Sequence, residues 1–282
     1  FVNLINAGDY DGYTIRDNLP TDLVDYSSAD FDSFDGSIVD TPDDTEAPYS
    51  SAAQEAFYAA IVQGKQYGMV YDFELPTAGN FVGTEGASYS PESSQSASEQ
   101  TGSISNGTGH GSLQYYGFLS VNLFDNGHGG SAGDSPGDDL GIATNMGNDA
   151  DRGYNQTFNG SQYLEVLPSN NDEGGVGFMF AEDASGFGFF LMGRESDKRH
   201  VYIEIIRRDS SGNVEIVRQL TGADPLNEGG QQYVAYKLDP SSDYVIEGFV
   251  LTEESPSTSV SNLRDIFAVD DLVVAVDATV TG

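Results

Sequence analysis

From residue 69 onward, apolar residues either alternate with polar ones or form short runs that end at Gly, Asn or Asp. Both patterns indicate β-strands, because successive side chains of a strand point to opposite faces of a sheet. The clearest pair is a hairpin in which residues 200–207 and 214–219 flank turn-forming residues at 209–213. In all, the pattern predicts ten strands, at 69–74, 113–124, 162–167, 176–181, 186–192, 200–207, 214–219, 233–238, 244–251 and 266–276.

Residues 51–63 show a different spacing and are rich in the helix-favouring residues Ala, Gln and Glu. Ala53, Phe57, Ala60 and Ile61 recur at intervals that place side chains on one face of a helix. We therefore predict one short helix in this segment.

Ten strands and one short helix predict an all-β protein, a jelly-roll β-sandwich, rather than an α/β fold. We place the sandwich domain at residues 66–282 and an acidic N-terminal extension, which contains the helix, at residues 1–65. Apolar residues are scattered through the extension, so we expect it to pack, either on the sandwich domain or on a neighbouring copy of the protein. Short strands are expected near 13–16 and 37–39.

Two long polar stretches interrupt the strand pattern. Residues 83–112 are rich in Ser, Gly, Glu and Gln, and residues 125–161 are rich in Gly, Asp and Asn. We expect both to be long loops.

The charge of the chain narrows its possible partners. Asp and Glu number 45 against 11 Lys and Arg, so the formal net charge is −34. Such a surface repels nucleic acid, which is bound through cationic contacts to phosphate, and it disfavours anionic membranes. It favours cations, and calcium above all, because carboxylate oxygens suit that ion. A solvated acidic surface adapted to saline water is the alternative explanation, and it is compatible with calcium sites.

Composition also bears on the compartment in which the protein works. The chain has no Cys, which excludes disulfides and thiolate metal ligands. No run approaches the roughly 18 apolar residues of a membrane-spanning helix. The sequence shows no signal peptide and does not begin with Met, so we expect a mature secreted chain that is extracellular or attached to the cell surface.

Two pairs of acidic residues stand on predicted core strands. Asp72 and Glu74 point to the same face of the strand at 69–74, whereas Asp270 and Asp271 interrupt the apolar strand at 266–276. Adjacent acids in a buried strand are costly unless they are paired or bind a metal. If the two strands lie side by side, the four acids converge and supply several of the six to eight oxygens that calcium takes. The alternative is that they end their strands and face water.

These motifs resemble those of a known class of domain. An early Asp-Phe-Glu strand at 72–74 and a closing Val-Asp-Asp-Leu strand at 269–272 resemble those of calcium-stapled jelly rolls, which include bacterial carbohydrate-binding modules and related extracellular domains. The stretches at 158–166 and 186–193 are also similar to strands of such domains. The resemblance covers about residues 69–276. It implies a jelly-roll fold with calcium as a structural cofactor and the four acids Asp72, Glu74, Asp270 and Asp271 as its ligands.

Catalytic patterns are missing from the sequence. It lacks the Glu-x-Asp-x-Glu strand of jelly-roll glycosidases. The acids of the strong hairpin, Glu204 and Glu215, are expected to form cross-strand salt bridges with Arg207, Arg208 or Arg218. We therefore expect no enzyme activity.

Sugar-binding surfaces normally present exposed aromatic rings, and the chain has no Trp. Tyr115, Tyr116 and Tyr154 are the candidate ligand-binding rings. Alternating Tyr residues in a strand also pack in cores or across strands, which is the competing interpretation.

Three functions remain in view. The first is a non-catalytic extracellular structural protein, a calcium-stabilised jelly-roll subunit of a surface layer, filament or matrix, whose N-terminal extension pairs with a neighbouring copy in a homo-oligomer or polymer. The alternative is a calcium-dependent carbohydrate-binding module with a polysaccharide partner. The third and least favoured is a polysaccharide hydrolase or lyase.

Overall fold

The computed structural model describes residues 14–30, 48–64, 66–71, 111–114, 119–125, 139–144, 162–167, 174–192, 200–221, 231–254 and 267–277. These residues form many strands and a single helix, so the all-β prediction is confirmed. The elements are β1 (Thr14–Arg16), β2 (Leu23–Asp25), β3 (Ser28–Asp30), α2 (Pro48–Gln63), β4 (Gln66–Tyr71), β5 (Gly111–Gln114), β6 (Leu119–Asp125), β7 (Asp139–Thr144), β8 (Gln162–Leu167), β9 (Gly174–Met192), β10 (His200–Asp209), β11 (Val214–Leu220), β12 (Gln231–Leu238), β13 (Tyr244–Glu254) and β14 (Phe267–Asp277).

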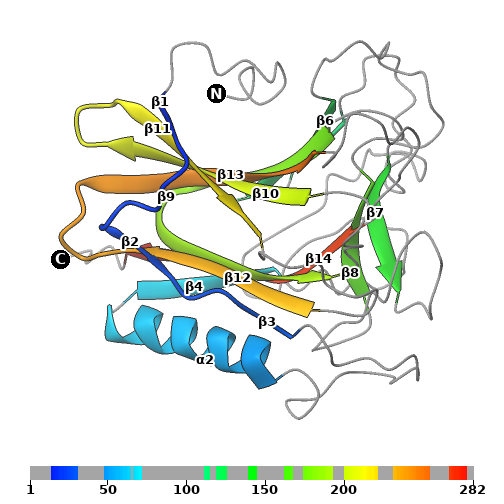
Figure 1. The fold of residues 1–282 in the computed structure, drawn as a ribbon, viewed down its shortest axis with the longest axis horizontal. Helices are drawn as coiled ribbons and strands as arrows, with labels where there is room; N and C mark the ends of the chain where they lie inside the picture. Colours follow the sequence, from blue (N-terminus) through cyan, green and yellow to red (C-terminus); the bar gives the residue numbers. More distant parts are fainter. Residues whose placement is uncertain are drawn as a thin grey trace.

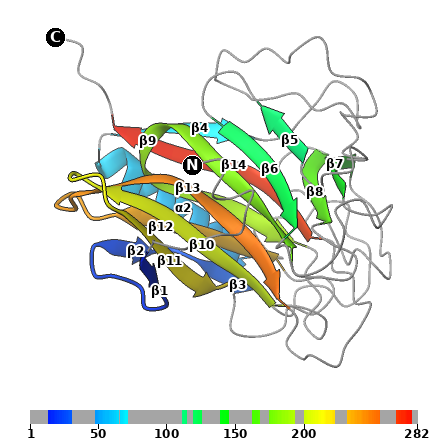
Figure 2. The same cartoon turned by 90° about the horizontal axis from the view of Figure 1, so that it is seen from above.

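The strands form a sandwich of two layers that share one long strand, β9 (Figure 1). The first part of β9 pairs with β13 and β6, and its last part pairs with β12 and β14. One layer therefore runs β1-β11-β10-β13-β9-β6-β5. In the other layer β12, β9 and β14 are neighbours, β4 and β8 share the far edge of β14, and β7 follows β8. Figure 2 shows β9 running from one layer into the other.

The core between the layers is dominated by stacked Phe rings. The ring of Phe249 on β13 lies 4.7 Å from that of Phe178, 4.5 Å from that of Phe187 and 4.9 Å from that of Phe189, measured between centroids. All four side chains are fully buried. The alternation that predicted these strands thus reflects one face turned toward the opposite layer.

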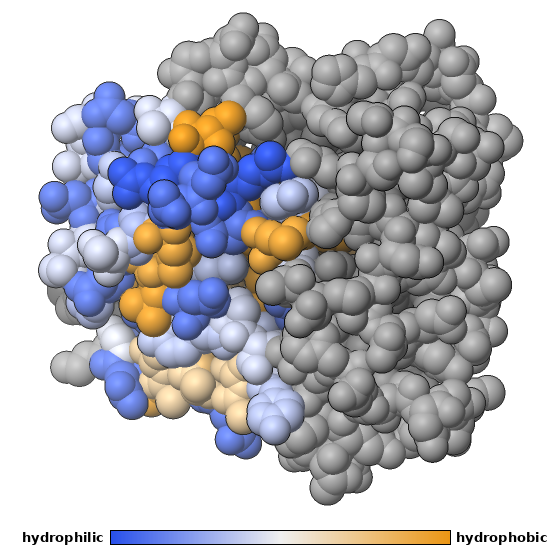
Figure 3. All heavy atoms as spheres, in the orientation of Figure 1, coloured by the Kyte–Doolittle hydropathy of each residue, from blue (hydrophilic) through white to orange (hydrophobic). Residues whose placement is uncertain are grey.

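Helix α2 covers the outer face of the second layer. Its residues Ala53, Phe57 and Ile61 are buried against β9, β12 and β14, as the helical spacing predicted, while Ala60 is half-buried. The opposite face of the helix is exposed, carries alanines together with Tyr58 and Val62, and includes the pale orange strip at the bottom of Figure 3. Burial of one apolar stripe therefore fixes the helix on the sheet.

The segment from residue 14 to residue 30, here called the arm, lies on both layers. Its strand β1 pairs in parallel with β11 of the first layer. Its strands β2 and β3 pair with β12 of the second layer. The arm thus adds strands to the edges of its own sandwich.

The hairpin of β10 and β11 forms as predicted. Its turn is held by Asp209, whose Oδ1 accepts hydrogen bonds from the backbone N–H groups of Ser211 at 2.9 Å and Asn213 at 2.8 Å. Gly212 adopts a left-handed φ of 88°, which costs glycine little.

Three strand predictions differ from the structure. The predicted strands at 176–181 and 186–192 are one strand, because the polar residues between them lie on a bend with shifted register rather than in a turn. The predicted strand at 113–124 is described as two, β5 and β6, and β7 lies within the stretch that was expected to be a loop. The short strand expected at 37–39 lies outside the described residues.

Candidate functional site

A pocket of about 860 Å³ opens at one end of the sandwich. Its lining comes from the part of β9 that crosses between the layers and from the turn of the β12–β13 hairpin. The end of α2, the start of β4 and the end of β14 supply the rest. Each of these ends presents polar side chains, and the hairpin end of the molecule is mostly blue and white at the left of Figure 3. The volume lies within the range typical of small-molecule sites.

The pocket is strongly acidic. Four carboxylates line it, from Glu182, Asp183, Asp239 and Asp277. Its described lining residues include no Lys or Arg. The site therefore favours a ligand that is neutral or positively charged over an anionic one.

The other lining groups are hydrogen-bonding side chains and one aromatic ring. The amides come from Gln63 and Gln66, the hydroxyls from Ser185 and Ser242, and the ring from Tyr244. Together with the carboxylates, they offer both donors and acceptors to a polar ligand.

Several lining carboxylates are held in place by neighbours. Oδ1 of Asp277 accepts a hydrogen bond from Nε2 of Gln66 at 2.8 Å, and Oδ1 of Asp183 accepts one from Arg208 at 2.9 Å. Asp239 accepts hydrogen bonds from the hydroxyl and the backbone N–H of Ser241, and these lower its pKa. The acceptor atoms are thus oriented before any ligand arrives.

A buried cation lies beside this acidic group, in addition to Arg208. Lys237 of β12 is buried, and burial lowers the pKa of its ammonium, although the charges of Asp277 and Asp239 act in the opposite direction. Its Nζ donates to the carbonyl of Leu238 at 3.4 Å. Lys237 and Arg208 together do not offset the four lining carboxylates, so the surroundings of the pocket are negative.

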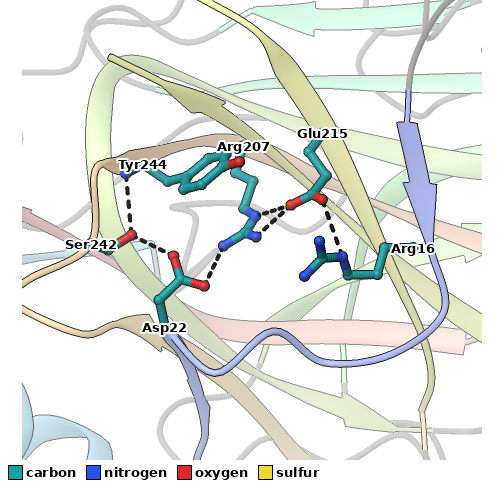
Figure 4. Close-up of polar contacts among 6 residues, drawn as sticks. All are labelled: Arg16, Asp22, Arg207, Glu215, Ser242 and Tyr244. Carbon is teal, nitrogen blue, oxygen red and sulfur yellow. Dashed lines mark hydrogen bonds and ion pairs between the residues drawn. The ribbon is translucent and has the colours of Figure 1, made fainter. Parts of the chain in front are cut away.

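A buried arginine supports the wall that carries Tyr244 (Figure 4). Arg207 is 2% exposed, and its guanidinium lies 3.9 Å from the centre of the Tyr244 ring. Its Nε donates to Glu215 at 2.7 Å and its Nη1 donates to Asp22 of the arm at 2.9 Å. Glu215 also pairs with Arg16 of the arm at 3.1 Å.

Asp22 connects the arm to the pocket. Its Oδ2 accepts a hydrogen bond from the hydroxyl of Ser242 at 2.7 Å. Burial raises the pKa of Asp22, but the hydrogen bonds from Arg207 and Ser242 and the charge of Arg207 outweigh it, so the pKa is lowered overall. Asp22 is therefore held as a carboxylate between Arg207 and the hairpin.

The salt bridges predicted for the strong hairpin are confirmed. Glu215 pairs with Arg207, and Glu204 pairs with Arg218 at 3.4 Å. In each case the two residues are direct register partners of β10 and β11.

Of the acids predicted to bind calcium, the structure describes two. Asp270 and Asp271 lie in β14 and are 0% and 4% exposed. They stand at a β-bulge, where β14 has an extra residue relative to β9 and Asp271 has a left-handed φ of 47°. Asp72 and Glu74 lie outside the described residues, as do the candidate sugar-binding residues Tyr115, Tyr116 and Tyr154.

The strand arrangement on which the calcium prediction depends is present. Strand β4 runs antiparallel beside β14, with its last residue Tyr71 opposite Leu272. Asp72 follows Tyr71 in the sequence. Within the described part of the chain, no group of three or more His, Asp or Glu side chains is arranged so that it could hold a metal ion.

The charge of Asp271 acts on tyrosines of α2 and β12. Burial, and after it the charge of Asp271, raises the pKa of Tyr58 on α2 to about 12. The pKa of Tyr233 on β12 is also raised, first by burial and then by the charges of Tyr58 and Asp271.

Sequence reasoning missed the pocket. Its lining residues run from Gln63 to Asp277 and come from turns and strand ends that are distant in sequence. The only local signals are small acidic or hydroxyl-rich stretches such as 182–185 and 239–243, which also suit ordinary turns.

Comparisons with known proteins give partial likenesses of fold. No protein-family model matches the chain, and no curated protein matches its sequence significantly. Similar solved structures include the C-terminal family 22 carbohydrate-binding module of Clostridium thermocellum Xyn10B, with 14% identity and a TM-score of 0.31 over 51% of this chain and 84% of that one. The module TmCBM61, solved with β-1,4-galactotriose, has 12% identity and a TM-score of 0.25 over 49% of this chain and 82% of that one.

A structure from the β-sandwich superfamily of carbohydrate-binding modules has 9% identity and a TM-score of 0.33, over 49% of this chain and 52% of that one. At TM-scores this low, the likeness identifies neither a family nor a ligand for this chain. Among the described residues, no helix has both the length and the apolar character needed to cross a membrane.

Proposed function

We propose that the chain is a non-catalytic, extracellular carbohydrate-binding domain that takes a neutral saccharide in the pocket at the end of the sandwich. The observation that carries the proposal is the lining of that pocket, which combines oriented carboxylates, amides, hydroxyls and an aromatic ring. Saccharide hydroxyls both donate and accept hydrogen bonds, and hydrogen bonds to a carboxylate are stronger than those between neutral groups. The Tyr244 ring adds an apolar surface for the face of a sugar ring.

Charge selects among saccharides. Four carboxylates in the lining, on a chain of net charge −34, oppose uronate or sulfate groups. Neutral glycans therefore fit the site better than the anionic polysaccharides that an acidic protein would bind only through a bridging cation.

The state of the carboxylates favours binding over hydrolysis. A general acid that cleaves a glycosidic bond needs a raised pKa, whereas hydrogen bonds from Ser241 lower that of Asp239. Asp183 is engaged by Arg208. Asp239 is therefore arranged to accept hydrogen bonds rather than to deliver a proton.

Isothermal titration calorimetry tests the proposal. We expect the protein to bind at least one of the neutral oligosaccharides xylohexaose, galactotriose and mannohexaose, and not a polyuronate. Glu182→Ala and Asp277→Ala should each weaken binding by about 10-fold or more, because each removes a charged acceptor. Glu55→Ala, the same kind of change on the exposed face of α2, should leave the affinity unchanged. Failure to bind any neutral glycan, or equal affinities for pocket and control variants, would contradict the proposal.

Calcium forms a separate part of the proposal. Asp270 and Asp271 are buried carboxylates that come directly before the part of β14 paired with β4, and they fit the role of hard oxygen ligands together with Asp72 and Glu74. The ion would stabilise the junction of the two strands. It is distinct from the pocket, whose lining includes neither Asp270 nor Asp271.

Thermal unfolding with and without calcium checks this role. We expect calcium in excess over EDTA to raise the melting temperature, since a ligand at about 100 times its Kd adds about 2.7 kcal/mol. Asp271→Gly should abolish the calcium-dependent rise. In EDTA the same variant should be no less stable than the wild type, because Gly adopts the left-handed φ at little cost. A full calcium response in Asp271→Gly, or none in the wild type, would show that these acids do not bind the ion.

Assembly into a layer or filament, the first function considered from the sequence, stays a prediction. The described strands of the arm pair with β11 and β12 of the same chain. The pocket gives the carbohydrate-binding alternative more support.

A further inference from the structure

One wall of the pocket is held in place by the arm. The β12–β13 hairpin contributes Asp239, Pro240, Ser242 and Tyr244 to the lining. Its turn is closed by the hydrogen bond from the backbone N–H of Ser242 to the carbonyl of Asp239 at 2.9 Å. Such a turn depends on its neighbours for a fixed position relative to the rest of the pocket.

Asp22 contacts this hairpin at two places. Its backbone carbonyl accepts a hydrogen bond from the N–H of Asp239 at 2.8 Å, and its Oδ2 accepts one from the hydroxyl of Ser242 at 2.7 Å. The oxygen of Ser242 in turn accepts the backbone N–H of Tyr244 at 3.1 Å. Asp22 thus holds the start of the turn and, through Ser242, the start of β13.

The same carboxylate ties the hairpin to the interior. Oδ1 of Asp22 accepts the hydrogen bond of Arg207, whose guanidinium lies against the ring of Tyr244 (Figure 4). Tyr244 is therefore fixed at its backbone through Ser242 and at its ring through Arg207. Asp22 is the residue that touches both of these supports.

The position of Asp22 depends on the docking of the arm. The next residue, Leu23, is buried in the core between the layers and begins β2, which pairs with β12. The N–H of Tyr26 donates to the carbonyl of Ala235 at 2.9 Å. If the arm leaves the sandwich, Asp22 leaves the hairpin with it.

We infer that Asp22 is a positioning residue for the saccharide pocket, and that docking of the arm and binding of saccharide are coupled. The inference rests on the proposed function. Coupling between two equilibria is reciprocal. Bound saccharide therefore stabilises docking of the arm by the same free energy by which the docked arm stabilises binding of saccharide. The arm thereby gives the protein a way to change its affinity without any change at the groups that contact the sugar.

Hydrogen–deuterium exchange combined with calorimetry tests the inference. In Asp22→Ala, which keeps the backbone carbonyl, the amide of Tyr244 should exchange about 10-fold faster, and the affinity for the oligosaccharide that the wild type binds should fall about 10-fold. Asp22→Asn keeps an acceptor for Ser242 but loses the charge that pairs with Arg207. Its exchange rate and its affinity should therefore lie between those of the wild type and those of Asp22→Ala. In the wild type, saturating saccharide should slow exchange at Leu23 and Tyr26 of the arm, and it should not do so in Asp22→Ala.

Asp25→Ala is the matched control. Asp25 also belongs to the arm, but its carboxylate accepts the backbone N–H of Ser27 at 2.8 Å rather than a group of the hairpin. This variant should change neither the hairpin exchange nor the affinity. If it weakens binding as much as Asp22→Ala does, the effect comes from general loosening of the arm and the inference is overturned.

The remaining outcomes separate this inference from the proposed function. Unchanged affinity in Asp22→Ala, with or without faster hairpin exchange, would overturn the coupling while leaving carbohydrate binding intact. A wild type that binds no saccharide would overturn the proposed function and the coupling together. Hairpin exchange would then still decide whether Asp22 positions the turn.

Discussion

Replacing Arg207 with alanine is expected to lower the free energy of unfolding by about 3–5 kcal/mol, as is typical when one partner of a buried ion pair is removed. The guanidinium is 2% exposed and contacts Glu215, Asp22 and the ring of Tyr244. Its loss leaves Glu215 buried, with Arg16 of the arm as its remaining ion-pair partner among the described residues. Urea unfolding followed by circular dichroism measures the change.

Arg208 is the matched control, since it is the next residue of the same strand. It pairs with Asp183 and Glu247 at the surface, where ion pairs contribute little. Arg208→Ala should therefore cost much less than Arg207→Ala. The double variant Arg207→Met, Glu215→Leu removes both buried charges and should regain most of the lost stability. Equal losses for the two arginines would show that the buried network is not a main support of this end of the sandwich.

Phe249→Ala should cost about 3–5 kcal/mol for a different reason, the loss of apolar contact and the cavity that remains. The ring of Phe249 is stacked with three other buried Phe rings from β9. Each such aromatic pair adds about 0.5–1.5 kcal/mol beyond the burial of area. The measurement is again the free energy of unfolding in urea.

Two variants separate stacking from simple volume. Phe249→Leu keeps most of the volume but loses the stacked rings, so its loss should be smaller than that of Phe249→Ala. Phe180 lies at the rim of the cluster, half-buried and 6.1 Å from the centre of the Phe249 ring. If Phe180→Ala is as destabilising as Phe249→Ala, the stacked rings at the centre contribute no more to the free energy of unfolding than the ring at the rim.

The sequence was informative where burial imposes a pattern. The strands of the β10–β11 hairpin were predictable because one face is buried, and the pairing of Glu215 with Arg207 was predictable because both lie on that hairpin. Helix α2 was predictable from Ala53, Phe57 and Ile61, which recur at the helical interval and meet the sheet. In each case the signal is local, and local spacing determines which side chains share a face.

The sequence was not informative where distant segments meet. The polar residues in the middle of β9 looked like a turn because a strand that crosses between layers exposes part of its length. Strands β2 and β3 have three residues each, too few for a period to show. Asp22 was one acid among many in the extension, and only the fold reveals that it lies between Arg207 and Ser242.

The shared strand β9 has a consequence for the pocket. Two stacked sheets that are joined only by loops can slide past each other as rigid bodies, whereas here the backbone from Glu182 to Ser185 passes from one layer to the other. The same residues line the pocket, so its walls meet at a covalent junction. Relative movement of the layers would have to bend this backbone, and the walls contributed by the two layers therefore keep their alignment even if the far ends of the sandwich shift.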